Sequence, residues 1–468
     1  MTGNRKLVRG LTLYDSTSIV ICSIIGTGVF LKTGIMAQYT GSPLLVMAAW
    51  MAAGLLSLAG ALTYAELGAM LPKAGGDYVY LQTAYGEGVA FLYGWMYITV
   101  GASGAAALAA AFAMFLASTF PIGTVWIERT IHLFGHEVFW QFGIKQVVAI
   151  AAIIFCGALN CAGVSFSGSV QSFITTIKVL GVLAVIALVF LFSKEATWEN
   201  LVPYTEAPRW CGIKAFGAAM LASLWAYNGW TFLGLVAGEV KKPEKNIPRA
   251  IITGMLVVLV VYMLANLSYF YALPFDEVMT SNSTMYRNAP PVATKAVLTF
   301  LGPFGFRLIT ILFIISTIGT LHTEMLVIPR ISYAMARDGL FFSPFGRLSK
   351  RTRVPVFAVC FKVFLACLLA CSGTFDQLTT LLIFALWIFY GMTASSVFVL
   401  RRKMNNAPQP YRMIGYPVVP FFFVLTAVWL VVNTLLTNPL ESMFGLMLIL
   451  PGVPLYYYFR ARRHQSRT

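Results

Sequence analysis

The stretch Ser23–Phe30 (SIIGTGVF) interrupts an apolar segment that runs from residue 11 to residue 39. Two glycines, Gly26 and Gly28, flank the β-branched Thr27, and each glycine disfavours a helix by about 1 kcal/mol. We therefore expect the helix to break here. If the segment crosses a membrane, an unwound backbone is tolerated only where protein or a water-filled cavity satisfies its amides and carbonyls. The alternative is that the two glycines only allow close packing between helices.

The composition places such segments in a membrane. Hydrophobic residues make up 59% of the 468 residues and charged residues 11%, as is typical of a polytopic membrane protein. We predict an all-α fold with twelve membrane-spanning helices, near residues 11–39, 43–71, 88–120, 144–164, 168–193, 213–238, 250–273, 303–336, 355–373, 376–400, 415–437 and 441–459. We predict no cofactor and no metal site, because the seven Cys show no ligand spacing and the four His are scattered.

The positions of the charges explain the formal net charge of +16. Basic residues cluster in alternate loops: of the 33 Lys and Arg residues, 22 fall on the side that holds the N-terminus and eight on the opposite side. This positive-inside pattern predicts a protein embedded in membrane lipid, with residues 1–10 and 460–468 both cytoplasmic. It also disfavours a nucleic-acid partner, which would need a continuous basic face.

A second interruption lies in the sixth predicted span, in the stretch Leu224–Trp230 (LWAYNGW). Asn228-Gly229 is a strong turn signal in the middle of an apolar segment. Each of the two breaks lies about 15 residues into its span, and each opens a block of five spans, residues 11–193 and 213–400. Paired interruptions at corresponding positions of two halves predict an inverted repeat with a binding site between them, and they disfavour a channel. Residues 415–459 then form two further helices.

With both breaks placed, the chain resembles amino acid permeases of the amino acid–polyamine–organocation superfamily, and most of all their L-type branch, which includes bacterial serine/threonine exchangers. The matching motifs are Ile24–Phe30, the loop Pro72–Tyr78, Trp225–Trp230, Gly238–Ala250 and Pro329–Gly339. The resemblance implies a LeuT-type fold, which is a 5+5 inverted repeat with two extra C-terminal helices, the first and sixth helices being discontinuous.

The resemblance also implies a site for the backbone of an α-amino acid. The amides of Thr27 and Gly28 would bind the carboxylate, with Gly26 helping the turn, and the carbonyls of Ile24, Trp225 and Ala226 would bind the ammonium. Amide N–H groups favour an anion, and the carbonyls that end a half-helix favour a cation. The remaining substrate-binding candidates of the sixth span are Tyr227, Asn228 and Gly229. Trp225 stands where relatives carry an aromatic residue that closes over the substrate.

Lys178 is a further candidate, because it lies about ten residues into the fifth span, where a lysine is costly and usually functional. The resemblance implies that it fills the place where sodium-coupled relatives bind an ion. Its ammonium would then bridge carbonyls near Gly26 and hydroxyls such as those of Ser316 or Thr317. The alternative is a lysine that extends to the membrane interface.

Two features depart from the family pattern. His322 and Thr323 replace a frequent Asn-Gly, and Glu324 adds a carboxylate inside the membrane, so His322 and Glu324 are candidates for the substrate's side-chain pocket. Glu324 either faces the substrate or is a hydrogen-bonded acid of the core; Glu66 is expected to be structural. Loop 121–143 contains no Cys, and only Cys211 lies in a predicted outer loop, so no disulfide-linked heavy subunit is expected.

These features predict a secondary transporter of amino acids in the plasma membrane, the inner membrane if the source is bacterial. It would be a sodium-independent exchanger that works by alternating access. The alternative is a proton-coupled amino acid symporter in which Lys178 or Glu324 titrates. An enzyme is disfavoured, because the sequence contains no convergent catalytic groups and no phosphate-binding loop.

Overall fold

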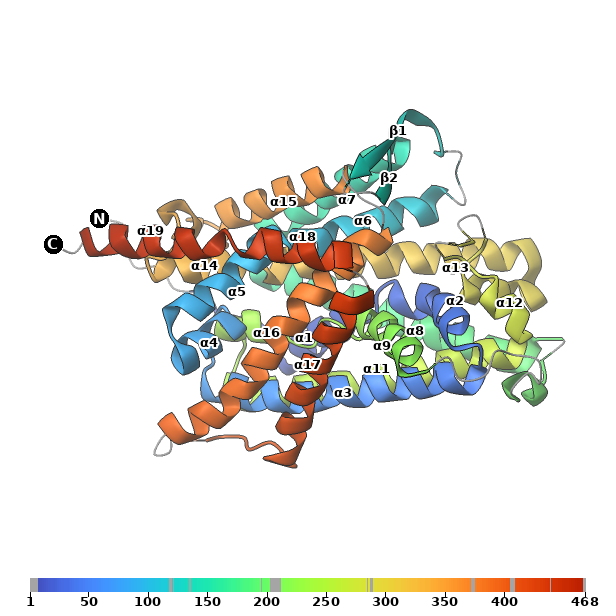
Figure 1. Cartoon of the computed structure of the whole chain (residues 1–468), viewed down its shortest axis with the longest axis horizontal. Coiled ribbons are helices and arrows are strands. Elements are labelled where there is room, and N and C mark those ends of the chain that lie inside the picture. Colours follow the sequence, from blue (N-terminus) through green and yellow to red (C-terminus); the bar gives the residue numbers. More distant parts are fainter. Residues whose placement is uncertain are drawn as a thin grey trace.

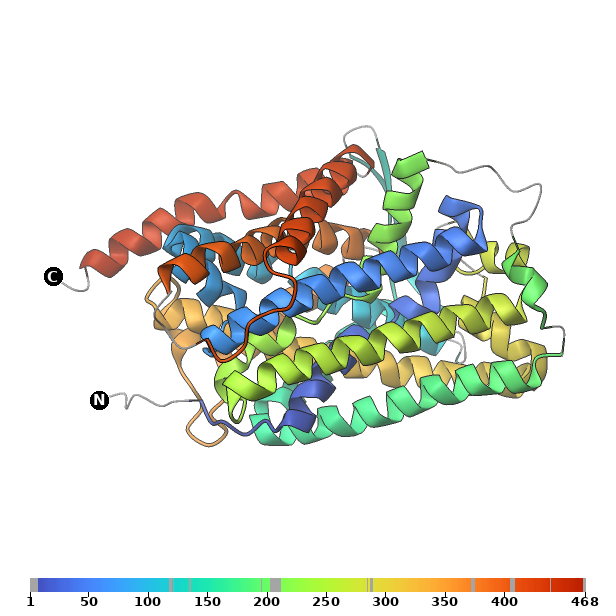
Figure 2. The same ribbon diagram turned by 90° about the horizontal axis from the view of Figure 1, so that it is seen from below.

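The computed structural model describes residues 7–117, 120, 122–133, 136–194, 196–202, 212–283, 285–286, 289–371, 375–404, 409–437 and 439–465. Cys211 and the outermost residues of the two predicted cytoplasmic termini lie outside the described residues. The molecule is a bundle of helices that run mostly along its long axis, and both ends of the chain lie at the same end of the bundle (Figures 1 and 2).

Two spans are broken where the sequence predicts a break. The first consists of α1 (Leu13–Ile24) and α2 (Gly28–Thr40), with the three residues 25–27 outside both helices. The sixth consists of α9 (Gly212–Ala226), the single turn α10 (Phe232–Leu235) and the 3-10 turn η2 (Ala237–Glu239). Gly229, with a φ of 126°, lies between α9 and α10 and allows the chain to reverse there.

Within the described residues, ten helical segments are long and apolar enough to cross a membrane, and two shorter apolar helices, α9 and α15 (Val356–Ala370), fall in the sixth and ninth predicted spans. The other membrane-length segments are formed by α3 (Pro43–Met70), α5 (Glu87–Thr99) with α6 (Ala102–Ala117), α7 (Ile144–Cys161), α8 (Val164–Phe192), α11 (Pro243–Ala272), α13 (Val292–Val327) with α14 (Pro329–Arg337), α16 (Phe375–Lys403), α17 (Val418–Thr437), and α18 (Pro439–Ile449) with α19 (Gly452–Gln465). Short helices α4 (Asp77–Tyr85), α12 (Phe275–Met279), η1 (Trp198–Leu201) and η3 (Ser343–Gly346) lie between them.

The expectation of a purely helical chain is wrong in one place. Loop 121–143 contains an antiparallel hairpin of β1 (Val125–Leu133) and β2 (His136–Gly143), which pairs Thr130 with Phe139. Both strands are rich in aromatic and β-branched residues, which fit a pleated surface better than a helix. The hairpin lies away from the two chain ends (Figure 1).

The third span holds a break that the sequence analysis missed. Helix α5 ends at Thr99 and α6 begins at Ala102, and the amides of both Val100 and Gly101 donate to the carbonyl of Met96. Gly101 directly precedes α6, and its carbonyl accepts a hydrogen bond from Nζ of Lys362 on α15.

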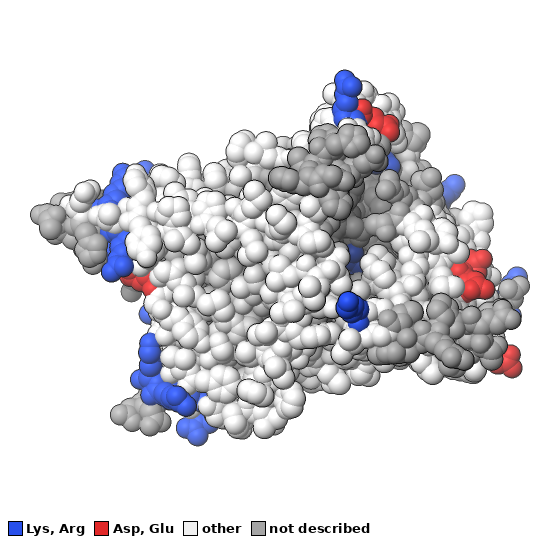
Figure 3. All heavy atoms as spheres, in the orientation of Figure 1, with Lys and Arg blue, Asp and Glu red and all other residues white. Residues whose placement is uncertain are grey.

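The end of the bundle that carries the termini is held closed by main-chain and side-chain contacts. The amide of Leu11 donates to the carbonyl of Glu239 at 3.0 Å, and the amide of Lys241 donates to the carbonyl of Leu11 at 2.8 Å. The fully buried Arg330 pairs with Glu239 at 2.9 Å, which ties α14 to the end of the sixth span. On the face shown in Figure 3, Lys and Arg gather at this end and most of the visible Asp and Glu lie at the other.

Candidate functional site

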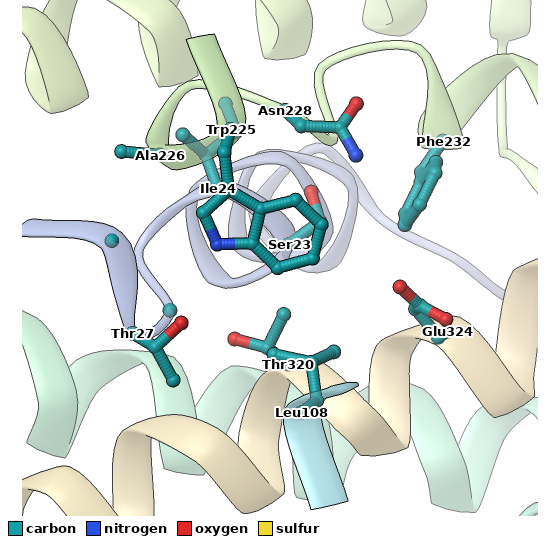
Figure 4. A pocket seen from close by; sticks show the side chains of 12 residues that line it. Ser23, Ile24, Thr27, Leu108, Trp225, Ala226, Asn228, Phe232, Thr320 and Glu324 are labelled. Atoms are coloured by element: carbon teal, nitrogen blue, oxygen red, sulfur yellow. The ribbon is translucent and has the colours of Figure 1, made fainter. Parts of the chain in front are cut away.

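A partly open cavity lies where the two helix breaks meet. The first break lines it with Ser23, Ile24, Gly26, Thr27 and Gly28, and the second with Trp225, Ala226, Asn228 and Phe232; Leu108, Thr320 and Glu324 complete the lining. In Figure 4 the indole of Trp225 projects into the space between the first break and α13. The structure therefore brings together most of the residues that the resemblance selected from the two unwound segments.

One side of the cavity presents amide donors. Helix α2 begins at Gly28, so the amides of Thr27 and Gly28 have no helical acceptor, and the main-chain hydrogen bonds of the described residues use neither of them. Such amides carry partial positive charge and suit an anion. Gly28 must be a glycine for a separate reason: an added Cβ would lie 2.3 Å from the Cβ of Ala226 and 2.5 Å from its Cα. The two breaks thus touch backbone to backbone at this point.

The other side presents carbonyls, and a tyrosine that the sequence analysis missed fixes two of them. The hydroxyl of Tyr262 on α11 lies 2.8 Å from the carbonyl oxygen of Ile24 and 2.9 Å from that of Ala226. Tyr262 thereby joins the two breaks. Each carbonyl oxygen has two lone pairs, so both retain capacity for a second donor. The carbonyl of Trp225 accepts from the amide of Asn228 at 3.2 Å.

Three candidates from the sixth span differ in position. The amide side chain of Asn228 lines the cavity, and its Oδ1 accepts from the hydroxyl of Tyr390 at 2.7 Å. Tyr227 is fully buried and packs against Trp50 and Tyr262 rather than lining the cavity. Gly229 lies so close to the first break that an added Cβ would approach Ser23 to 2.8 Å, so its role is to let the two segments meet.

Lys178 is fully buried on α8 and reaches the carbonyl end of α1. Its Nζ donates to the carbonyl of Cys22 at 3.2 Å, to the carbonyl of Ile25 at 2.5 Å and to the hydroxyl of Thr320 at 3.1 Å. The carbonyls that end a helix carry partial negative charge, so a lysine ammonium is well placed there. The interfacial alternative does not fit this position, because the ammonium lies inside the bundle.

Of the two hydroxyls on α13 that were predicted to bond near Lys178, only that of Ser316 reaches the first break. Thr320, which the sequence analysis did not name, holds both Lys178 and the carbonyl of Cys22, the latter at 2.9 Å. Ser316 donates to the carbonyls of Ile25 and Gly26 at 3.3 and 3.1 Å. Thr317 instead donates to Phe313 of its own helix, so it does not reach the first span. Because Thr320 lies one helical turn after Ser316, periodicity alone would have found it.

Of the two residues predicted to form the side-chain pocket, His322 and Glu324, only Glu324 lines the cavity. Glu324 lines the cavity, and its Oε2 lies 3.8 Å from Nζ of Lys362 on α15. His322 points away from the cavity, with Nδ1 2.8 Å from Oε1 of Gln171 on α8. Neighbouring residues on a helix face different directions, which explains why only one of the pair reaches the cavity.

Glu66 on α3 has a structural role, but its principal partner is a side chain rather than the expected neighbouring backbone. Its two carboxylate oxygens each lie 2.7 Å from a guanidinium nitrogen of Arg401, and the amide of Met413 donates to Oε2 at 2.7 Å. This bidentate pair joins α3 to α16 and to the segment before α17, well away from the cavity lining.

Comparisons with known proteins identify the family. A family model described as amino acid permease matches residues 11–452. The serine/threonine exchanger SteT of Bacillus subtilis is 32% identical over 464 residues, which is 99% of each chain. The human cystine/glutamate transporter is 29% identical over 97% of this chain and 86% of its own, and the human b(0,+)-type amino acid transporter 1 is 28% identical over 97% and 88%. The chain belongs to the amino acid permease family, and it is a transporter rather than an enzyme.

Proposed function

We propose that this permease exchanges amino acids across the plasma membrane, by alternating access to the cavity between the two helix breaks. The proposal rests on one observation: the cavity has backbone amides on one side and backbone carbonyls on the other. Unbonded amides of Thr27 and Gly28 suit a carboxylate, and carbonyls near the end of α9 suit an ammonium. A zwitterionic α-amino acid fits both sides at once, which neither an organic anion nor a metal ion does. The similar protein SteT is a serine/threonine exchanger, which supports exchange.

We further propose that exchange does not depend on sodium. Lys178 donates to carbonyls and a hydroxyl beside the first break, and such oxygens are the ligands that an alkali cation would use. The lysine ammonium occupies that space and supplies the positive charge. The same lysine keeps the alternative of proton coupling open, with Glu324 as the second titratable group beside the cavity.

The layout that goes with this function is a LeuT-type 5+5 inverted repeat over residues 11–193 and 213–400, with two extra helices over residues 415–459. It is supported by breaks at corresponding positions of both halves. We also propose that both termini are cytoplasmic, in a bacterial inner membrane or another plasma membrane, because basic residues gather at that end. No disulfide-linked heavy subunit is proposed, since loop 121–143 contains no Cys.

Counterflow in proteoliposomes tests the exchange. Vesicles containing the purified permease are loaded with unlabelled serine or left empty, and uptake of labelled serine is followed in sodium and in choline buffers. We expect internal serine to stimulate uptake severalfold, equally in both buffers and with a protonophore present. Uptake that rises as the external pH falls and collapses with the protonophore would favour the proton symporter instead. Uptake that is indifferent to internal serine would contradict exchange.

The proposed topology makes a separate prediction at Gly123, where an added Cβ would meet no atom within 4 Å. Gly123→Cys should react with a membrane-impermeant thiol reagent in intact cells, because residues 121–143 would lie outside. The comparison is with the parent protein, whose native cysteines define the background. Reaction of Gly123→Cys only after permeabilisation would reverse the assigned orientation.

A further inference from the structure

Glu324 contributes a carboxylate to the lining of the cavity. The residue is only 4% exposed, and its Oε2 has no hydrogen-bond partner among the described residues. The ammonium of Lys362 lies 3.8 Å away, which is within ion-pair range but beyond hydrogen-bond range. Figure 4 shows the carboxylate on the side of the cavity that holds Asn228 and Phe232. Because Oε2 is buried and faces Lys362, Oε1 is the oxygen of this cavity-lining carboxylate that remains for a donor on a bound molecule.

Lys362 lies behind Glu324 and not in the cavity lining. It is 4% exposed, and its Nζ donates at 2.5 Å to the carbonyl of Gly101, which lies at the break between α5 and α6. The same lysine borders a second cavity, of about 290 Å³, between α5, α14 and α15. Gly104 makes room for this arrangement, since an added Cβ there would lie 2.8 Å from Oε1 of Glu324. The break in the third span thus fixes the ammonium on the far side of the carboxylate.

The charges of Glu324 and Lys362 determine which substrate side chains can bind beside Glu324. An isolated carboxylate at this depth would attract a cationic side chain, because bringing two opposite charges together lowers the cost of burying each. With Lys362 fixed behind it, Glu324 contributes to a pair with no net charge. A cationic side chain is then disfavoured, because the charge of Glu324 is already neutralised by Lys362. An anionic side chain is also disfavoured, because it is repelled by the carboxylate of Glu324, which is nearer than Lys362. A neutral side chain with a hydroxyl or amide donor satisfies the acceptor at no charge cost.

We propose that Glu324 and Lys362 together select the substrate side chain of this transporter. Glu324 accepts a hydrogen bond from a small neutral side chain that carries a donor, and Lys362 is a positioning residue that keeps the subsite neutral and so excludes cationic side chains. The proposal rests on the proposed function, since it assumes that an amino acid occupies this cavity. The cavity walls formed by Leu108, Trp225 and Phe232 restrict the side chain to a small size.

Matched substrates test the acceptor in the unmodified protein. Threonine and valine have nearly the same shape and differ by a hydroxyl against a methyl group, so their inhibition constants for labelled serine counterflow report the hydrogen bond. We expect threonine to inhibit about tenfold or more better than valine, because only threonine can donate a hydrogen bond to the carboxylate of Glu324 in the cavity lining. Equal inhibition constants would overturn the role of Glu324 without requiring any variant to fold.

Charge variants test Lys362. In Lys362→Met the carboxylate loses its counter-charge, so the ratio of the inhibition constants of diaminobutyrate, whose short side chain ends in an ammonium, and threonine should shift by about tenfold or more toward the cation. The double variant Glu324→Gln/Lys362→Met removes both charges and keeps an acceptor, so the ratio should return close to its original value. Lys362→Arg keeps the charge and should keep the ratio. A lysine with a merely structural role would not move this ratio.

These experiments distinguish failure of the proposed selectivity from failure of the proposed transport function. If the unmodified protein exchanges serine but Lys362→Met exchanges with an unchanged ratio, the selectivity role of Lys362 is wrong and the transport function stands. If no amino acid drives counterflow in the unmodified protein, the proposed function itself fails.

Discussion

Lys178→Ala is expected to reach the membrane and bind substrate, but to lose most of its exchange. In the structure the ammonium donates to the carbonyls of Cys22 and Ile25 and to the hydroxyl of Thr320, but Lys178 itself does not line the cavity. Hydrogen bonds to a charged group each contribute about 1.5–3 kcal/mol, so their loss should loosen the first break from α13 and slow exchange by roughly tenfold or more. Binding should weaken less, since Lys178 does not line the cavity.

Two further variants give this prediction its controls. Lys178→Arg keeps the charge with a different shape and should be intermediate. Thr317→Val should remain close to the parent protein, because the hydroxyl of Thr317 bonds only to its own helix among the contacts that the structure describes. Counterflow gives the exchange rate and thermal stabilisation by serine gives the binding. Unimpaired exchange in Lys178→Ala, or sodium-dependent uptake by the parent protein, would refute the role assigned to this lysine.

Gly28→Ala should abolish substrate binding, although it adds a single methyl group. The new Cβ would lie 2.3 Å from the Cβ of Ala226, a separation that real atoms do not adopt, so the two breaks would have to move apart. Such movement displaces the amides on one side of the cavity relative to the carbonyls on the other. A displacement of about 1 Å in a site of this kind costs roughly a hundredfold.

Gly26→Ala is the matched control, two residues away in the same break. Its added Cβ would lie 3.3 Å from the hydroxyl oxygen of Thr320, a side chain that can give by a few tenths of an ångström. We therefore expect Gly26→Ala to lose much less affinity for serine than Gly28→Ala, with similar amounts of folded protein for both, as measured by size-exclusion chromatography in detergent. Equal affinities for the two variants would contradict the close approach of the two breaks.

The two helix breaks could be predicted because their signals are local, whereas the binding roles of their backbone groups come from the family resemblance and stay a prediction. Gly26 and Gly28 two residues apart, and Asn228-Gly229, disfavour a helix locally, and a lysine at the depth of Lys178 is costly enough to require partners. The hairpin at 125–143 was missed because the loop was treated only as a connector, although its aromatic and β-branched residues favour strands.

The residues of the site that could not be predicted from the sequence are those whose contacts join distant segments. Tyr262 reaches the carbonyls of Ile24 and Ala226 from α11, and nothing near it in the sequence indicates those partners. Lys362 gains its partners only because α15 packs beside the break at Gly101. The one sequence signal for Lys362 was its position within an apolar segment, where a lysine needs partners. His322 and Glu324 are only two residues apart, and their side-chain directions follow from the packing of α13 rather than from the sequence pattern.

The central claim is that the amides of Thr27 and Gly28 hold the carboxylate of an amino acid. Competition against labelled serine counterflow by serine, serine methyl ester and serine amide tests it most directly, because the three compounds share a side chain and an ammonium group but only serine carries the anion. The account predicts that the ester and the amide compete at least about a hundredfold more weakly than serine, since partially positive amides lose their anionic partner. A methyl ester that competes as well as serine would contradict it.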